Sequence, residues 1–427
     1  MGIVNLVQAF DAQYFEKLNL VASENVSSAN VRYALQSDLN HRYAIPPEGQ
    51  RDPAIWDYPN QSTIHKIIAE TEDIACELFH AKKADTSPLS GNQIAAIMLS
   101  SLLEQGDTFL SVGPKCGGHF TTEKLAQERG YNRIDLPYDL DVGSIDVEQT
   151  ADIVAQTGAK LIFLDASMIL FPYPVRELRE ALGDDVIISY DASHTLGMIA
   201  GKAFQSPLEE GADFLHGSTH KSLWGPQKGI ILSAQSPENS KIAAKVFSSI
   251  VPLFVSNAHP HHIAALGIAL EESRDYGAQF AQNTVRNARI LGDTLKKHGV
   301  EVCFPERGYT ECHQIIVKIG TKAEGQDAFR KLESANINVN AISVPFSSSD
   351  EYGLRIGLSE ITRRGIVGEE TLKIGTLIAD AIQNKRPIEE IRNDVIHISR
   401  AHKDIHYTNS ETTIVPQQPS LVRHPKI

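Results

Sequence analysis

Short apolar runs alternate with segments of helical spacing through the first half of the chain. Runs rich in β-branched residues are typical of strands, and apolar residues three or four positions apart are typical of helices. The predicted strands are TFLSVG from 108, LIFLDAS from 161, VIISYDAS from 186, FLHGSTH from 214 and GIILSA from 229, with helices such as QIAAIMLSSLLEQ and VRELREAL between them. This alternation predicts α/β architecture with a mostly parallel sheet, which binds ligands at the carboxyl ends of its strands.

The second half predicts one long helix followed by a smaller α/β unit. Residues 259–298 contain few helix breakers, which suits a connector leaving the large domain. After them, QIIVKIG and INVNAIS are predicted strands, and GQDAFRKLESA, EETLKIGTLIADAIQN and IEEIRNDVIHISRA are predicted helices. We therefore expect an N-terminal arm and large domain over residues 1–280, a small C-terminal domain over 281–400, and a polar tail over 401–427.

Composition narrows the class of protein. A chain of 427 residues with 42% hydrophobic and 22% charged residues suits a soluble enzyme with two cores. The net charge of -13 disfavours nucleic acid and anionic membranes as partners. With neither a targeting segment nor a long apolar span, the expected location is the cytoplasm. The cysteines are widely spaced, which predicts free thiols and no metal site.

The strongest chemical pattern is HGSTHKSLWGPQKG, residues 216–229, in which Lys221 follows an apolar run and precedes a glycine-containing loop. A partly desolvated lysine at the mouth of a sheet is a nucleophile that forms imines with carbonyl compounds. The alternative is a surface lysine in a turn, so the surrounding residues must decide.

Asp191 ends the apolar run VIISYD, where an unpartnered buried acid would be costly. A protonated pyridine nitrogen is a partner that would resolve this cost, because the carboxylate keeps such a ring an electron sink. His194 follows three residues later and is a candidate for contact with the same ring or with a substrate carboxylate. The alternative is that Asp191 caps a helix and His194 is a hydrogen-bonded core residue.

Three further patterns are weaker on their own. Ser90, Gly91 and Asn92 open a predicted helix and form an anion site, although such a sequence is also common in helix caps. His119, in CGGH, follows a predicted strand and is placed to lie against an aromatic ring, or is structural. Arg355, in GLRIG, can bind a carboxylate through two hydrogen bonds, or form a surface ion pair.

Taken together, the motifs resemble the serine hydroxymethyltransferase family, which are fold-type I pyridoxal-phosphate enzymes with an aspartate aminotransferase-like fold. The resemblance runs from about residue 15 to 400. It is carried, in order, by LVASEN, RYA, SGNQ, GDT, GGH, DASH, THK, GPQKG, GYTECH, INVNAISVP, LRIG and ITRRG. The fold it implies has a large, mostly parallel sheet domain and a smaller α/β domain, with pyridoxal 5'-phosphate as cofactor.

The resemblance also implies roles for individual residues. Lys221 would carry the cofactor as a Schiff base, Asp191 would hold the ring nitrogen and His119 would stack on the ring. The catalytic set it implies is Lys221, Asp191, His119 and His194. The other residues implied to bind the cofactor are Ser90, Gly91, Asn92, Ser167, Thr219, His220 and Gly225, with Ser167 and His194 on its hydroxyl side.

Substrate recognition is implied for four more residues. Ser23 and Arg355 would clamp the substrate carboxylate. Tyr43, Tyr58 and the Gly225 loop would serve the cofactor of a partner subunit, which implies an obligate homodimer with shared active sites.

Two departures from the family pattern bear on the reaction. Ile45 occupies the place of a glutamate that acts in folate-dependent one-carbon transfer, and only the displaced Glu48 could substitute for it. Ile342 stands where the family has an asparagine near folate. The forms HGSTHK, GPQKG and W-x-[YF]-P instead resemble the threonine transaldolases, a branch of the family found in natural-product pathways.

The expected function is therefore to make or break the Cα–Cβ bond of β-hydroxy amino acids. The expected route is a threonine aldolase or transaldolase reaction through a glycyl quinonoid, with an amino acid and an aldehyde as substrates. His119, His194 and Glu48 are candidate general bases. The alternatives are a tetrahydrofolate-dependent hydroxymethyltransferase, another pyridoxal-phosphate reaction such as transamination, decarboxylation or elimination, and a binding protein without activity.

Overall fold

The computed structural model describes residues 2–44, 58–59, 61–347 and 350–409. Its main feature is a seven-stranded sheet in the order β2-β10-β9-β8-β7-β3-β4. Its strands are β2 (Lys83–Asp85), β3 (Thr108–Ser111), β4 (Asn132–Asp135), β7 (Leu161–Asp165), β8 (Ile187–Asp191), β9 (Phe214–Ser218) and β10 (Gly229–Ser233). Only β10 runs antiparallel to its neighbours, so the predicted, mostly parallel sheet is confirmed.

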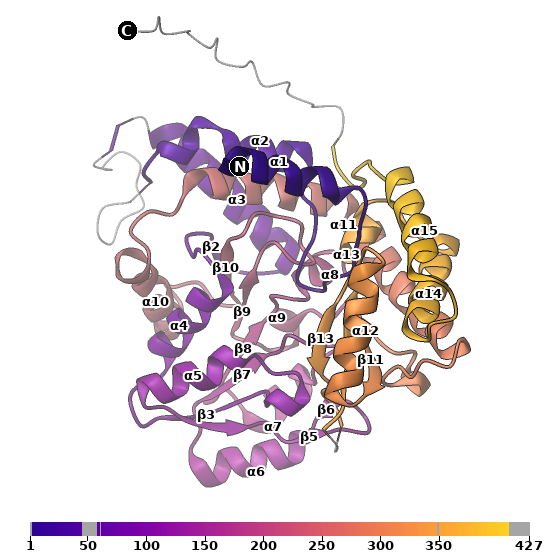
Figure 1. The fold of residues 1–427 in the computed structure, drawn as a ribbon. Helices are drawn as coiled ribbons and strands as arrows, with labels where there is room; N and C mark the ends of the chain where they lie inside the picture. Colours follow the sequence, from indigo (N-terminus) through magenta and orange to yellow (C-terminus); the bar gives the residue numbers. More distant parts are fainter. Residues whose placement is uncertain (1, 45–57, 60, 348–349, 410–427) are drawn as a thin grey trace, which may run out of the picture.

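Helices cover both faces of this sheet (Figure 1). Side chains of β7 alternate between two hydrophobic cores: Ile162 and Leu164 pack into one, and Leu161 and Phe163 into the other. Strands buried on both faces form continuous apolar runs, which explains the pattern in the sequence. The associated helices are α3 (Gln61–Phe79), α4 (Gly91–Leu102), α5 (Phe120–Arg129), α6 (Val147–Thr157), α7 (Val175–Leu182), α8 (Leu196–Ala200), α9 (Pro207–Glu210) and α10 (Lys241–Ser249).

A smaller α/β unit lies beside the large sheet, orange to yellow in Figure 1. Its three-stranded antiparallel sheet has the order β11-β14-β13 and a hydrophobic core of its own. The long helix α11 (Pro260–Lys297) connects the two units, and the predicted boundary at 280 falls inside it. The elements are β11 (Gln314–Gly320), β13 (Asn340–Ser343), β14 (Tyr352–Gly357), α12 (Lys322–Ser334), α13 (Ser359–Arg363), α14 (Glu369–Ile382) and α15 (Ile388–Ala401).

The predicted strand INVNAIS is two strands in the structure. Its first part, β12 (Ile337–Asn338), pairs with β1 (Leu18–Asn19), whereas β13 pairs with β14. The chain divides its hydrogen bonds between two neighbours at Val339, so the single predicted strand was wrong. A separate hairpin is formed by β5 (Tyr138–Asp139) and β6 (Ser144–Ile145).

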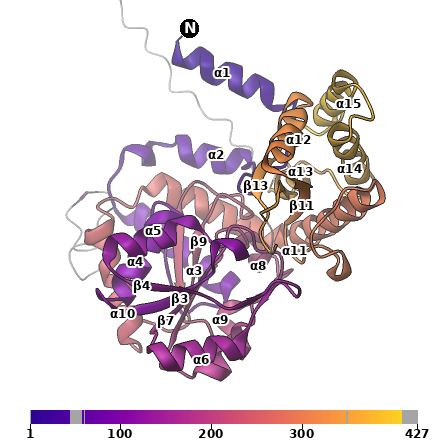
Figure 2. The same ribbon diagram turned by 60° about the horizontal axis from the view of Figure 1, so that its bottom comes forward.

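The two ends of the described chain differ in their packing. Helix α1 (Ile3–Tyr14) has no buried residue and stands apart from the rest of the molecule in Figure 2, whereas α2 (Ala29–Gln36) packs on α11. The beginning of the predicted polar tail is packed, because the Thr408 hydroxyl donates to Glu272 Oε1 at 2.6 Å. Among the described residues, no helix combines the length and the apolar character needed to cross a membrane.

Candidate active site

Lys221 lies in a hairpin connection between β9 and β10. The loop is closed by backbone hydrogen bonds from Thr219 N to Lys228 O at 3.0 Å and from Gly225 N to Thr219 O at 2.9 Å. Asn25 Nδ2 also donates to the Lys221 carbonyl at 2.8 Å, which fixes the loop from the N-terminal segment. Burial lowers the pKa of the Lys221 amine, which Asp191 partly opposes. A lysine held in this way is favoured as a nucleophile.

Asp191 is the last residue of β8, which lies between β7 and β9 in the sheet. In register, it pairs with Asp165 on β7 and with His216 on β9. Its Oδ1 accepts a hydrogen bond from Ser193 N at 2.7 Å, and its Oδ2 lies 4.0 Å from His216 Nδ1. The carboxylate is half-buried, so its charge is held at the carboxyl edge of the sheet.

Both candidate histidines favour the neutral form. His119 caps α5 by accepting from Thr121 N at 3.4 Å, and burial lowers its pKa. His194 is buried, its Nδ1 has no hydrogen-bond partner within the described chain, and burial lowers its pKa well below the usual value. It stacks on His313 with ring centroids 5.8 Å apart. Neutral imidazoles at these two positions can accept protons.

The N-terminus of α4 forms an anion cradle. Ser90 caps the helix, with its hydroxyl accepting from Gln93 N at 3.2 Å. A side chain in place of Gly91 would lie 3.3 Å from Ser193 Oγ and 3.5 Å from Ser218 Cβ, so only glycine leaves this space open. Ser218 Oγ is buried without a hydrogen-bond partner among the described residues. These hydroxyl and backbone donors are suited to a phosphate.

Arg355, on β14, reaches from the small unit to the mouth of the large sheet. Its guanidinium donates to Asn340 Oδ1 at 2.9 Å and to Ser167 O at 3.1 Å. Burial lowers its pKa to about 10, and no carboxylate of the described residues forms an ion pair with it. Ser23 lies on the neighbouring turn, since Ala22 packs directly against Gly357 of β14. Among the described residues, this partly buried cation lacks the acid that such groups usually have.

One pocket brings many of the predicted residues together. It has about 380 Å³ of empty space and is lined by Gly91, Asn92, His119, Asp191, His194 and Lys221, among others. The predicted Ser167 joins it through its carbonyl contact with Arg355. Asp165, Ser193, Ser218, His216 and His313 also lie at this end of the sheet but were not singled out from the sequence.

Other predicted residues lie outside that pocket. His220 and Gly225 line a neighbouring pocket together with Tyr14 and Glu360, and the buried Thr219 hydroxyl donates to Pro226 O at 2.7 Å. Their contact with the cofactor stays a prediction. Tyr43 and Tyr58 are exposed and stack on each other with ring centroids 5.4 Å apart. Ile45 and Glu48 lie outside the described residues.

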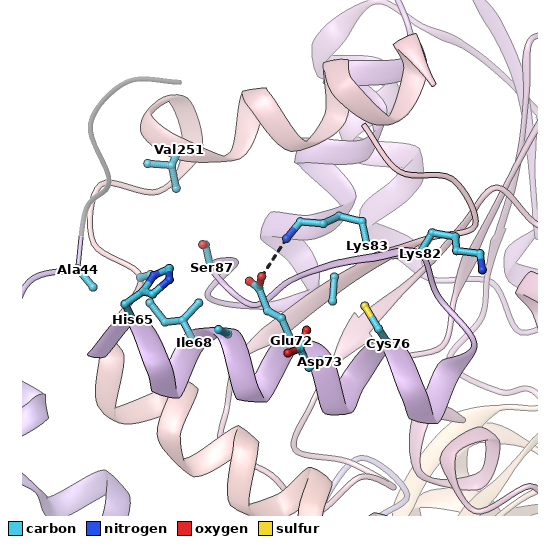
Figure 3. Close-up of a pocket in the computed structure, with 13 residues that line it drawn as sticks. Ala44, His65, Ile68, Glu72, Asp73, Cys76, Lys82, Lys83, Ser87 and Val251 are labelled. Atoms are coloured by element: carbon cyan, nitrogen blue, oxygen red, sulfur yellow. Dashed lines mark hydrogen bonds and ion pairs between the residues drawn. The ribbon is translucent and has the colours of Figure 1, made fainter. Parts of the chain in front are cut away.

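A larger pocket, with about 930 Å³ of empty space, lies away from Lys221 along α3 (Figure 3). His65, Ile68 and Glu72 point into it from successive turns of that helix. Glu72 forms an ion pair with Lys83 Nζ at 3.0 Å, so its charge already has a partner. None of the lining residues belongs to the predicted set, and size alone therefore does not identify the active site.

The residues around Lys221 fit the pyridoxal phosphate that the resemblance implies. The α4 cradle would supply donors for the phosphate, Lys221 would supply the amine, and Asp191 would supply the carboxylate for the ring nitrogen. Unpartnered buried atoms converge at this edge of the sheet, including His194 Nδ1, Ser218 Oγ and Asp165 Oδ1. Buried polar atoms are normally hydrogen-bonded, so their grouping indicates a polar ligand.

Comparison with known proteins gives a consistent result. The family model described as serine hydroxymethyltransferase matches residues 1–378. A serine hydroxymethyltransferase from Methanopyrus kandleri is 38% identical over 415 residues, covering 95% of this chain and 94% of that protein. A second serine hydroxymethyltransferase, from Archaeoglobus fulgidus, is 35% identical over 405 residues, covering 93% of this chain and 90% of that protein.

A solved structure extends the comparison. L-threonine transaldolase from Pseudomonas fluorescens, in the internal aldimine state, superposes with a TM-score of 0.90 and 27% identity, covering 95% of this chain and 92% of the other. The predicted fold-type I architecture and the pyridoxal-phosphate cofactor are thereby confirmed. This chain is an enzyme, and it belongs to the serine hydroxymethyltransferase family.

Proposed function

We propose that this enzyme makes and breaks the Cα–Cβ bond of β-hydroxy amino acids as a threonine aldolase or transaldolase. The observation that carries the proposal is Ile45, which stands where folate-using hydroxymethyltransferases have a catalytic glutamate. Ile342 adds support, because it packs against the apolar cluster of Leu170, Phe171 and Val344 where the family has an amide near folate. The threonine transaldolase name of the solved structure agrees with this choice.

In the proposed mechanism, the protein orients the bond that breaks. Arg355, with Ser23 beside it, binds the substrate carboxylate and sets the rotation about Cα. Pyridoxal phosphate, when bound through Lys221, supplies an electron sink for the charge that develops at Cα. Asp191 would hold the ring nitrogen, and His119 would lie against the ring.

Cleavage also requires a base for the β-hydroxyl proton. Burial keeps the pKa values of His119 and His194 below the usual range, so both are neutral near pH 7 and can accept that proton. Glu48 is the third candidate. After cleavage, an aldolase would add a proton at Cα, whereas a transaldolase would join Cα to the carbonyl carbon of a second aldehyde.

A folate-dependent serine hydroxymethyltransferase is the second candidate. It is favoured by the names of the relatives that are 35% and 38% identical to this chain. In that case Glu48 would replace the missing glutamate. The two candidates differ in whether tetrahydrofolate accelerates serine cleavage.

The deciding experiment adds L-threonine, glycine, and L-serine with tetrahydrofolate to the purified enzyme in turn, and records absorbance while a coupled assay follows acetaldehyde. Acetaldehyde release from threonine without a response to folate is expected. Folate-dependent turnover of serine with little threonine cleavage would contradict the proposal. Lys221→Ala is the control, and it should show no turnover with any substrate.

We also propose a homodimer with shared active sites. Tyr43 and Tyr58 are exposed and lie outside the pocket of their own Lys221, and Gly225 lines a different pocket. Aromatic rings at these positions could serve the cofactor of a second copy. The exposed apolar helix α1 supplies a surface for the association.

A further inference from the structure

Asp165 is a buried acid at the cofactor pocket that the proposed mechanism does not use. It ends β7 and pairs in register with Asp191, so two strand-terminal carboxyls stand side by side. Asp165 is only 1% exposed, and it lines the same pocket as Lys221. A buried acid without a cationic partner favours its neutral form.

The two oxygens of Asp165 have different surroundings. Oδ2 accepts a short hydrogen bond from the Thr122 hydroxyl on α5, whereas Oδ1 is buried and has no partner in the described part of the chain. No ion pair within the described residues involves Asp165, since Arg133 on β4 is committed to Asp135, Ser111 and Val112 O. Oδ1 is therefore free to form a hydrogen bond with a group bound in the pocket.

The groups around Asp165 determine whether its carboxyl keeps a proton. Burial, with a smaller contribution from Asp191 on β8, raises the pKa of Asp165 well above its usual value, and the Thr122 hydrogen bond and Arg133 on β4 lower it only partly. His119 on α5 and His194 after β8 are neutral near pH 7 and supply no compensating charge. Two adjacent carboxyls seldom ionise together. Of the two, Asp191 has the contacts of an acceptor, because its Oδ1 accepts from Ser193 N and Lys221 lies nearby.

We propose that Asp165 is a further residue of the cofactor site, a carboxylic acid that keeps its proton while Asp191 is ionised and donates a hydrogen bond into the pocket from Oδ1. The pocket then holds one negative charge at the ring nitrogen instead of two. This inference rests on the cofactor site proposed above, but not on whether the reaction is an aldolase, transaldolase or hydroxymethyltransferase reaction.

Cofactor affinity tests the proposal in three variants, by spectroscopic titration of pyridoxal phosphate into each stripped protein. Asp165→Asn keeps a neutral donor of the same shape, so its dissociation constant should stay within about threefold of wild type. Asp165→Ala removes the donor and should weaken binding by about tenfold. Equal weakening in both Asp165 variants would show that the charged carboxylate is required and would overturn the proposal.

Asp191→Asn separates this inference from the site assignment. This variant should bind the cofactor more weakly than Asp165→Asn and shift the absorbance spectrum of the bound form. If Asp191→Asn left both affinity and spectrum unchanged, the cofactor site itself would be wrongly assigned. If it behaved as expected and Asp165→Asn matched it, only the neutral state of Asp165 would be refuted.

Thermal unfolding of the holoenzyme supplies a second readout. A raised folded-state pKa means that wild type loses stability as pH rises above the unfolded value, because the unfolded chain ionises and the folded one does not. The Tm of Asp165→Asn relative to wild type should therefore increase from pH 5 to 8, by roughly 2 °C per pH unit. Asp152→Asn, on the exposed side of α6, is the matched control and should show a constant difference. A constant difference for Asp165→Asn would overturn the proposal.

Discussion

Arg355 is held in place by neutral hydrogen-bond acceptors, which leaves its charge available for a ligand carboxylate. Its partners are an amide oxygen of Asn340 and the carbonyl oxygen of Ser167, so its charge is solvated but not neutralised. These contacts leave a fixed planar cation at the mouth of the pocket. A lysine at the same position would present a point charge without the two parallel donors.

Arg355→Lys should raise KM for the amino acid substrate by about tenfold or more, because one of the paired hydrogen bonds to the carboxylate is lost. The dissociation constant of pyridoxal phosphate should change far less. Steady-state kinetics with L-threonine and a cofactor titration measure the two effects. Arg392→Lys, on the exposed face of α15, is the control and should change neither. An unchanged KM in Arg355→Lys would remove Arg355 from the carboxylate site.

The sequence was sufficient to select residues in local motifs that lie together in the structure, and their roles stay predictions. Lys221, Asp191, His119 and Gly91 were predicted from strand ends and helix starts, and the structure places them around one pocket. Ser218 was not predicted, because its role depends on how closely β9 approaches α4. Asp165 could have been found, since LDAS repeats the strand-terminal aspartate pattern of YDAS.

At the scale of elements, one buried acid fastens the N-terminal segment to the small unit. Glu360 of α13 accepts from Tyr14 Oη of α1 at 3.0 Å and from Asn19 Nδ2 of β1 at 2.6 Å. Burial raises the pKa of Glu360 from its ordinary value of 4.5 to about 7. The carboxyl is therefore protonated in the folded protein at a pH where it is ionised in the unfolded chain.

Glu360→Gln should reveal this shift in a stability profile. The contribution of Glu360 is fully present below pH 4.5 and is lost as pH rises to about 7, so wild type should lose up to about 3 kcal/mol relative to Glu360→Gln over this window. Denaturant unfolding at pH 5, 6, 7 and 8 measures the difference. Glu306→Gln, whose side chain is 94% exposed, should show no such trend. A pH-independent difference for Glu360→Gln would contradict the assignment.

Element identity was predicted better than element pairing. The apolar runs at β3, β7, β8, β9 and β10 were all placed correctly, because strands buried on both faces have few polar residues. The antiparallel direction of β10 was not specified, although residues 219–228 are too few for a parallel crossover, which needs roughly a dozen or more. The division of INVNAIS between two sheets depends on pairing with β1, which is distant in sequence. No local sequence pattern can predict such a pairing.

At the scale of the whole molecule, no contact within the described part of the chain buries the apolar face of α1. Ile3, Leu6 and Phe10 recur at helical spacing and are 80%, 55% and 75% exposed. A stripe of this kind in a soluble protein usually marks an interaction surface. A second copy of the chain is the partner that the proposed shared active sites require.

Replacing Ile3, Leu6 and Phe10 together with serine should weaken self-association by removing this apolar surface. Analytical ultracentrifugation over a concentration series should show a dimer for wild type and an increased monomer fraction for the variant. A variant with Ile242 and Leu253 changed to serine, two exposed apolar residues away from α1, is the control. If the α1 variant remained fully dimeric, α1 would not form the interface.

The position of β10 has a consequence for how the protein is made. Strand β2 near residue 84 has only β10 as a neighbour in the sheet, and β10 begins at Gly229. During synthesis, all the parallel strands from β3 to β9 leave the ribosome before the chain that closes the lysine loop. Lys221, the residue proposed to carry the cofactor, is therefore among the last parts of the large sheet to be fixed. A nascent chain can then complete most of its core before it is able to hold pyridoxal phosphate.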